Sequence, residues 1–288
     1  MAECDELVET LRARLGTSVR RLLTGQAKPA PLRFAPADDD LGLFGPGSAA
    51  WQVHADLATI VGGVRAVLLQ TLHPLAMAAV ADHSDYRRDP LGRLHRTAGF
   101  LGATIFGTTP VAEQAVAQVR AIHDRVSGRA PDGRRYEAND PHLLAWIHVT
   151  EVDSFLVAHQ RYGRRPLDRT GADRYAAEMA RVGEMLGADA LPTTVASVRA
   201  AIEGFRPELA ATRQAHDAVR FLLWPPLPLS ARGPHALVVA GAVGLLPRWA
   251  ARALWLPRPP GADAVVVRPA CLAMLRVLGW SLEAPAAA

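Results

Sequence analysis

Apolar residues recur every three to four positions through most of the chain, which is the spacing that lines one face of an α-helix. Few segments show the strict alternation of apolar and polar residues that a half-buried β-strand requires. The pattern therefore predicts an all-α protein, a single globular domain of about ten helices.

Helix start and stop signals divide this pattern into elements. Prolines stand at or near several predicted helix starts, where a backbone N–H is not needed. Pro74 falls inside the apolar block at residues 51–83 and predicts a kink or break at His73–Pro74. The pair Asp132–Gly133 predicts the turn of a short hairpin. The expected helices are Glu6–Leu23, Pro90–Phe106, Pro110–Ser127, Pro141–Tyr162, Arg169–Leu186, Thr193–Glu203 and Pro207–Trp224, with two or three more between Ser230 and Trp280.

The chain divides into a short N-terminal part and one main domain. Residues 24–48 are dense in Pro, Gly and Asp, as loops are. We expect residues 1–50 to form a helix and a wrapping loop, and residues 51–288 to form the helical domain. The segment GPGSAA loosely fits a dinucleotide-binding loop, but no strand precedes it, so it favours a loop in which Ser48 caps a helix.

Composition narrows the class of protein. The 288 residues are 50% hydrophobic and 21% charged, which indicates a folded globular chain. Lys and Arg number 32 against 28 Asp and Glu, and the arginines are scattered. A nucleic-acid surface would need a clustered basic stripe, so we expect no nucleic-acid partner.

Location and membrane contact are read from three features. Cys4 and Cys271 stand far apart, which argues against a disulfide framework or a cysteine zinc site. The N-terminus lacks the apolar core of a signal peptide, so we expect a cytoplasmic protein. The apolar run at residues 236–247 is too short to span a bilayer and predicts a buried core helix, with contact to a membrane surface or apolar ligand as the alternative.

Two histidines fall on apolar helix faces. His123 shares a face with Val116 and Val119, and His148 shares one with Leu144 and Phe155. Such a histidine is either a satisfied core residue or a ligand, and periodicity leaves both readings open. A di-iron bundle is disfavoured because the expected Glu-x-x-His pairs are missing.

A third candidate cluster lies on the predicted helix at residues 90–106. Arg93, Thr97 and Phe100 fall on one face, with Arg96 beside them. A guanidinium and a hydroxyl one turn apart could bind a carboxylate or a small oxygen ligand. The alternative is a solvated helix with surface arginines.

The order of these segments resembles the MpaB-type oxygenase family, which is related to the rubber-cleaving latex clearing protein. The matching segments are LFGPGSAAWQVHAD, GGVRAVLLQTLHPLAMAAVADHSDY, DPLGRLHRT, VRAIHDRVSG and YEANDPHLLAWIHVTEVDS, within about residues 40–225. The resemblance implies an all-helical domain that binds a b-type haem without covalent attachment, in a pocket between core helices.

The resemblance also implies roles for particular residues. His123 matches the proximal haem iron ligand, and Arg93 and Thr97 match a distal arginine and threonine. Arg96 stands where the latex clearing protein has a lysine, and an arginine cannot act as an exchangeable ligand or base, which argues against rubber-type chemistry. The other cofactor-binding candidates are His73 and His148, either of which could supply a second axial ligand, His83, which has no assigned role, and, as partners of the haem propionates, Arg65, Arg87, Arg88 and Arg120.

The expected function is therefore that of a haem-dependent oxygenase acting on an apolar small molecule and dioxygen, with Arg93, Arg96 and Thr97 polarising an oxygen species or orienting the substrate. The alternative is a non-catalytic helical protein that binds haem or a lipid-like ligand. The oligomeric state stays open, a homodimer included.

Overall fold

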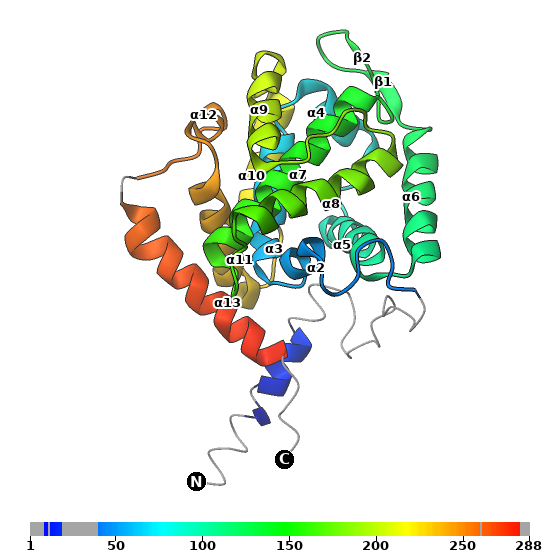
Figure 1. Ribbon diagram of the computed structural model, residues 1–288. Helices are drawn as coiled ribbons and strands as arrows, with labels where there is room; N and C mark the ends of the chain where they lie inside the picture. The colour runs from blue at the N-terminus through cyan, green and yellow to red at the C-terminus, as the bar shows by residue number, and fades with distance from the viewer. Residues whose placement is uncertain (1–8, 11, 19–39, 260, 283–288) are drawn as a thin grey trace, which may run out of the picture.

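The computed structural model describes residues 9–10, 12–18, 40–259 and 261–282. Helices dominate this part of the chain, and a single short hairpin is the sheet within it (Figure 1). The elements are α2 (Ala49–His54), α3 (Ala58–Gln70), α4 (Pro74–His83), α5 (Pro90–Phe106), α6 (Thr109–His123), β1 (Ser127–Arg129), β2 (Arg135–Glu137), α7 (Pro141–Tyr162), α8 (Arg169–Leu186), α9 (Val195–Phe205), η1 (Arg206–Glu208), α10 (Arg213–Leu223), α11 (Leu229–Leu245), α12 (Arg248–Ala253), the π-turn η2 (Asp263–Val267) and α13 (Arg268–Leu282).

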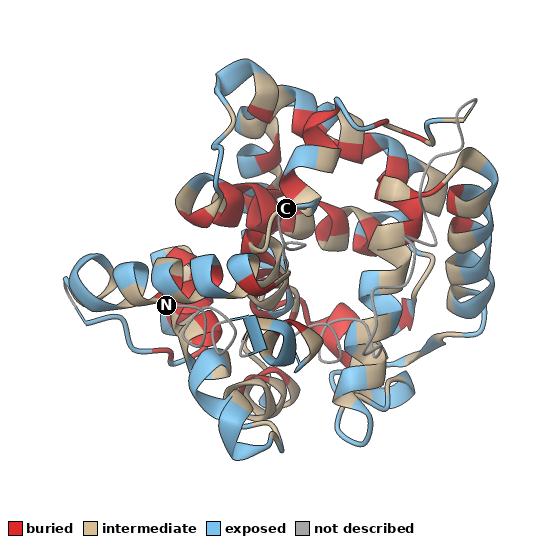
Figure 2. Ribbon diagram, turned by 90° about the horizontal axis from the view of Figure 1, so that it is seen from below, coloured by how far each residue is buried: buried red, intermediate tan, exposed pale blue. Residues whose placement is uncertain are grey.

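Helix α7 is the centre of the molecule. Buried residues lie on all of its sides, because α3, α8 and α9 pack around it. Figure 2 shows buried positions gathered on the inner helices and exposed positions along the outer ones. The two largest hydrophobic clusters meet at α7, which contributes Ala158 and Tyr162 to one and Trp146 and Phe155 to the other.

The crossing of α3 and α7 depends on a glycine. A Cβ at Gly62 would lie 2.9 Å from the Cα of Phe155 and 3.1 Å from the carbonyl oxygen of Ser154. Backbone cannot move away as a flexible side chain could, so only glycine permits this approach. The neighbouring Gly63 has more room, since its Cβ would meet only the Phe155 ring, at 3.8 Å.

One buried ion pair lies beside this crossing. Arg65 Nη2 is 2.7 Å from Asp153 Oδ2, and the same guanidinium donates to Ser154 Oγ at 2.6 Å and to the Leu245 carbonyl at 3.0 Å. Both charged side chains are almost fully buried. The guanidinium therefore joins α3, α7 and α11 within the core.

Pro74 breaks the apolar block as predicted. Helices α3 and α4 are bent by 107° at the break, where His73 is extended and Pro74 opens α4. The backbone N–H of Ala210 donates to the carbonyl of Leu72 at 2.8 Å, so the segment before α10 is tied to the break.

Several sequence predictions are confirmed. The bounds of α5, α7 and α8 are those expected, and Ser48 caps α2 by accepting from the Trp51 N–H. The hairpin forms around Gly133, whose φ of +87° suits glycine. The apolar run 236–247 lies largely in α11, which is a core helix. Of the predicted helix Glu6–Leu23, residues 9–10 and 12–18 are helical, and the remainder lies outside the described residues.

Two predicted boundaries are wrong by more than two residues. Helix α6 ends at His123 instead of Ser127, because the Val126 carbonyl accepts from the Ala138 N–H and residues 127–129 pair as a strand. Helix α10 begins at Arg213 instead of Pro207, because Thr212 caps it and Pro207 belongs to the separate turn η1. Pro207 therefore lies in a turn, and Thr212 precedes the first residue of the helix.

The C-terminal helix has few buried residues. The stretch Asp263–Leu282 has the length and mean hydropathy, 1.5, of a helix that could cross a membrane, and 17% of its most apolar window is buried. Length and composition are weak evidence, since the bent pair α3–α4 passes the same test from within the core. The expectation that no segment spans a membrane stays a prediction.

The glycine at the α3–α7 crossing provides a stability test. We expect Gly62→Ala to lower the free energy of unfolding by about 1–3 kcal/mol, because the added methyl group presses on α7 backbone. Gly63→Ala, the matched control, should be neutral or stabilising by up to about 1 kcal/mol through helix propensity. Urea unfolding of both variants measures this, and equal effects would refute the role of Gly62.

Candidate functional site

Helix α5 carries the predicted distal residues on its first turns. Asp89 caps this helix by accepting from the Gly92 N–H at 2.8 Å. Arg93 is half-buried and donates to Ser84 Oγ at 2.7 Å. Arg96 and Thr97 are exposed; Arg96 lies 3.4 Å from an Asp89 oxygen. The structure thus turns Arg93 inward and Arg96 toward solvent.

The Thr97 hydroxyl is engaged within its own helix. Its Oγ1 donates to the carbonyl of Arg93 at 3.1 Å. To donate to another group, this hydroxyl would have to rotate away from the Arg93 carbonyl. In its present orientation it can only accept a hydrogen bond from another group.

Glu151 is a titratable group that the sequence analysis did not propose as a site residue. Glu151 of α7 is half-buried, lies 3.5 Å from Gln70 Nε2, and interacts with the Arg93 guanidinium. Desolvation raises the pKa of Glu151 to about 7, although Gln70 and Arg93 both oppose the rise. Burial likewise lowers the pKa of Arg93, which is still a cation at neutral pH. A group that titrates near neutrality beside a fixed cation can hold or release a proton.

His123 ends α6, on the other side of the Gly107–Thr108 link from α5. Its Nδ1 is buried and has no hydrogen-bond partner among the described residues. Its Nε2 is not buried, and it donates to no described group. Desolvation lowers the pKa of His123, so its ring is neutral at pH 7. A neutral imidazole with one accessible nitrogen is suited to bind a metal.

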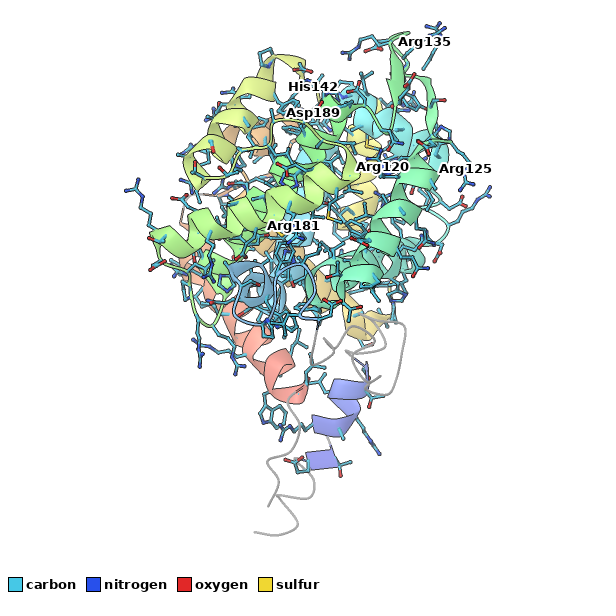
Figure 3. The ribbon with its side chains drawn as sticks, turned by 45° about the vertical axis from the view of Figure 1, so that its right-hand side comes forward. Arg120, Arg125, Arg135, His142, Arg181 and Asp189 are labelled. Atoms are coloured by element: carbon cyan, nitrogen blue, oxygen red, sulfur yellow. The ribbon has the colours of Figure 1, made fainter. Side chains whose placement is uncertain are left out.

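Helices α6, α7 and α8 meet near this histidine. Arg120, one turn before His123, donates to the Met185 carbonyl of α8 at 3.4 Å. Figure 3 shows Arg120 on α6 where that helix faces α7 and α8, with Arg125 at the outer edge. His148 of α7 is buried against α8, since a Cβ at Gly183 would lie 2.7 Å from its Nδ1. Desolvation lowers the pKa of His148 to about 4, and its buried Nε2 has no hydrogen-bond partner in the part of the chain that the structure describes.

Helix α7 therefore carries two polar side chains, His148 and Glu151, one turn apart, and they contact different neighbours. His148 points to the side of α8, and Glu151 points to the side of Arg93 and Gln70. No hydrogen bond or ion pair joins His123 to Arg93, Arg96 or Thr97 within the described part of the chain. The candidate functional residues are accordingly Arg93 on α5, His123 on α6 and Glu151 on α7.

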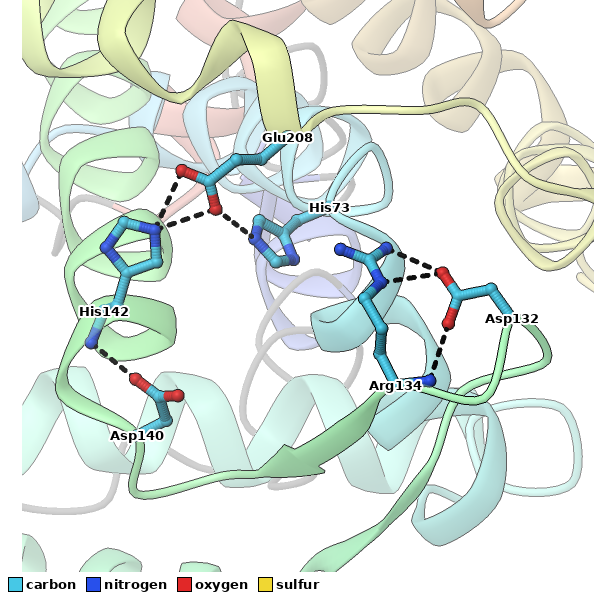
Figure 4. Close-up of polar contacts among 6 residues, drawn as sticks. All are labelled: His73, Asp132, Arg134, Asp140, His142 and Glu208. Carbon is cyan, nitrogen blue, oxygen red and sulfur yellow. Dashed lines mark hydrogen bonds and ion pairs between the residues drawn. The ribbon is translucent and has the colours of Figure 1, made fainter.

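His73 belongs to a different cluster. Its Nε2 lies 3.6 Å from Glu208 Oε2, and His142 Nε2 lies 2.8 Å from the same oxygen, so Glu208 bridges the two histidines (Figure 4). Burial lowers the pKa of His73, while Glu208 acts in the opposite direction. A cleft of about 280 Å³ adjoins this cluster and is lined in part by His142, Phe205 and Glu208.

The remaining predicted arginines and His83 are placed as follows. Arg65 is a core residue with its guanidinium engaged on three helices, which accounts for it without a cofactor. Arg87 is exposed, 4.0 Å from Asp217, and Arg88 is exposed. His83 Nε2 lies 3.2 Å from the Ser127 carbonyl, next to the hairpin. Arg93 thus interacts electrostatically with Glu151, whereas Arg65 and His73 belong to other contacts.

The donor set limits what the site can hold. The described residues contain no group of three or more His, Cys, Asp and Glu side chains that could together bind a metal ion. Haem iron takes its equatorial ligands from the porphyrin and needs only one side chain, so His123 with its accessible Nε2 fits that requirement. Apolar side chains on α5 and α6 are only partly covered: Leu91 and Leu94 on α5 are 40% and 46% exposed, and Ile122 on α6 is 45% exposed.

Glu151 provides a pH test of the site. Its pKa is higher in the folded chain, about 7, than the ordinary value of 4.5. The resulting stabilisation is present below pH 4.5 and is lost as the pH rises through 7. We expect the free energy of unfolding of the wild type to fall, relative to Glu151→Gln, between pH 5 and pH 7.5. Urea unfolding at the two pH values measures this difference, and parallel pH profiles would show that Glu151 has an ordinary pKa.

Comparison with known proteins identifies the family of the chain. The chain matches, over residues 51–280, the family described as "ER-bound oxygenase mpaB/B'/Rubber oxygenase, catalytic domain". Neither a search of curated proteins nor a search of solved structures gave a match. The match covers most of the chain, including α5, α6 and α7. The protein therefore belongs to the mpaB and rubber oxygenase family and carries its oxygenase catalytic domain.

Proposed function

We propose that this oxygenase works with a b-type haem held by His123 in the region bordered by α5, α6 and α7. The observation that carries the proposal is the state of His123, whose ring is neutral, buried at Nδ1 and accessible at Nε2. Haem, when bound, supplies the redox chemistry that activates dioxygen. The chain supplies the axial ligand, the surrounding charges and the apolar walls.

Arg93 and Glu151 are the groups proposed to act on the reacting molecules. Arg93 presents a half-buried cation, which stabilises negative charge developing on an oxygen atom more strongly than an exposed cation does. Glu151 holds or gives a proton at its carboxyl oxygen near neutral pH, because its pKa is about 7. Arg96 and Thr97 lie at the exposed side of α5, where they would orient a substrate as it enters.

The walls favour an apolar substrate. Leu91 and Leu94 on α5 and Ile122 on α6 leave much of their surface uncovered. An apolar ligand that covered these side chains would gain the free energy of removing them from water. The substrate is proposed to be an apolar small molecule, which Arg93 would hold or polarise at an oxygen atom.

Arg120 is the proposed partner of a propionate. It is exposed and lies one turn from His123. Its one side-chain hydrogen bond among the described residues, to the Met185 carbonyl, is long at 3.4 Å. Arg65 is not proposed as a propionate partner, because its guanidinium is paired with Asp153 in the core. His73 and His148 are also left out as iron ligands, since one lies beside Glu208 and the other is packed against Gly183.

The ultraviolet-visible spectrum tests the cofactor and its ligand. We expect the purified protein, supplied with haem and then reduced, to show a Soret band that shifts when carbon monoxide is added. His123→Ala should lose tight haem binding or change the spectrum, because the axial imidazole is gone. His148→Ala is the matched control and should keep the wild-type spectrum. An unchanged spectrum in His123→Ala would refute the ligand assignment.

Dioxygen consumption tests the role of Arg93. We expect apolar candidate substrates to stimulate consumption by the reduced protein, and Arg93→Leu to lower the stimulated rate by about 10²–10³-fold. Arg96→Leu should have a much smaller effect, because that side chain is solvated and its charge is screened. Equal losses in the two variants would contradict the inward role of Arg93. No stimulation across a broad panel would favour a haem-binding protein without turnover.

A further inference from the structure

Asn139 lies in the turn between β2 and α7, opposite the last turn of α6. Its Nδ2 donates to Asp124 Oδ1 at 2.5 Å and to the carbonyl of Arg120 at 3.3 Å. Both acceptors lie on the same side of the amide. Since a carbonyl oxygen could not donate to either of them, the orientation of the amide is determined.

The other end of this amide is an unused acceptor. Asn139 Oδ1 is buried and has no hydrogen-bond partner among the described residues. Buried polar atoms are nearly always paired, so such an atom calls for an explanation. The nearest explanation is a donor that forms its bond when the site is in its working state.

That donor is next to it. Asn139 bonds to Arg120 and Asp124, which stand on either side of His123 in the chain, and its side chain interacts with the His123 imidazole. The Nδ1 of that ring is buried and has no hydrogen-bond partner among the described residues. One atom is an acceptor, and the other donates only when the proton of the neutral ring is on Nδ1. A hydrogen bond between these two atoms would satisfy both at once.

We propose that Asn139 is a positioning residue: its Oδ1 accepts the Nδ1–H of His123, which keeps the proton on Nδ1 and directs the Nε2 lone pair to the accessible side of the ring. The inference rests on the proposed function, in which Nε2 binds the haem iron. Metal-binding histidines are generally oriented through their second nitrogen, and loss of that contact weakens metal binding.

The chain offers a control for a purely structural role. Asp124 holds the opposite end of the same amide, so Asp124→Ala loosens the turn without removing Oδ1. Asn139→Leu removes the acceptor and keeps the shape of the side chain. Asn139→Asp keeps an acceptor at the same position. A structural tie predicts similar effects for Asp124→Ala and Asn139→Leu, whereas positioning of His123 predicts an effect for Asn139→Leu alone.

The first readout needs no haem. In the haem-free protein labelled with ¹⁵N-histidine, long-range ¹H–¹⁵N spectra report which ring nitrogen carries the proton, and His123→Gln identifies the signal. We expect Nδ1–H in the wild type, in Asp124→Ala and in Asn139→Asp, and the Nε2–H form, which a free histidine side chain prefers, in Asn139→Leu. Nε2–H in the wild type, or Nδ1–H in Asn139→Leu, would overturn the proposal. If Asn139→Leu does not fold, Asn139→Ala provides the same comparison.

The second readout uses the haem-loaded protein. We expect Asn139→Leu to weaken haem binding by about 10–100-fold, while Asp124→Ala changes it little. The iron–histidine stretching frequency of the reduced protein should fall in Asn139→Leu and rise in Asn139→Asp, because a stronger acceptor makes the imidazole a stronger ligand. A frequency that is the same in all variants would count against the proposal. If the wild type binds no haem, the proposed function fails, and the tautomer of His123 still decides the role of Asn139.

Discussion

The close approach of α3 to α7 is the constraint on which the other contacts depend. Gly62 allows the two backbones to touch, and Arg65 then reaches Asp153 and Ser154 from the same face of α3. A buried ion pair offsets its desolvation only when its hydrogen bonds are complete, and the backbone contact provides that geometry. The position of α7 in turn determines where His148 and Glu151 point.

The candidate site combines neutral groups with one fixed cation in a partly desolvated region. His123 and His148 are neutral because burial disfavours their charged forms. For the same reason the pKa of Glu151 is raised to about 7. Arg93 keeps its charge because its ordinary pKa is so high. The same desolvation thus leaves neutral imidazoles and a carboxyl that titrates near pH 7, while the Arg93 guanidinium keeps its charge in spite of it.

Local signals predicted most helices correctly, and long-range contacts account for what they missed. Pro90 and Pro141 open α5 and α7 as their sequence positions indicate, and Pro74 breaks the chain as expected. The end of α6 could not be predicted from periodicity, because pairing with β2 determines it. Glu151 and Asn139 escaped the sequence reading for a related reason. The signal for Glu151 was its place one turn after His148, and its importance depends on Arg93 and Gln70, which are far away in the chain.

The break at His73–Pro74 also bears on how the domain unfolds. At the break, carbonyl groups after α3 lack the N–H partners that a continuing helix would supply. The Leu72 carbonyl accepts instead from the N–H of Ala210, well over a hundred residues away in the sequence. Leu72 is buried, so detaching the segment before α10 would leave that carbonyl unpaired without access to water. The second half of the chain is therefore coupled to the first, and α3, α4 and the segment leading into α10 should open together as one cooperative unit.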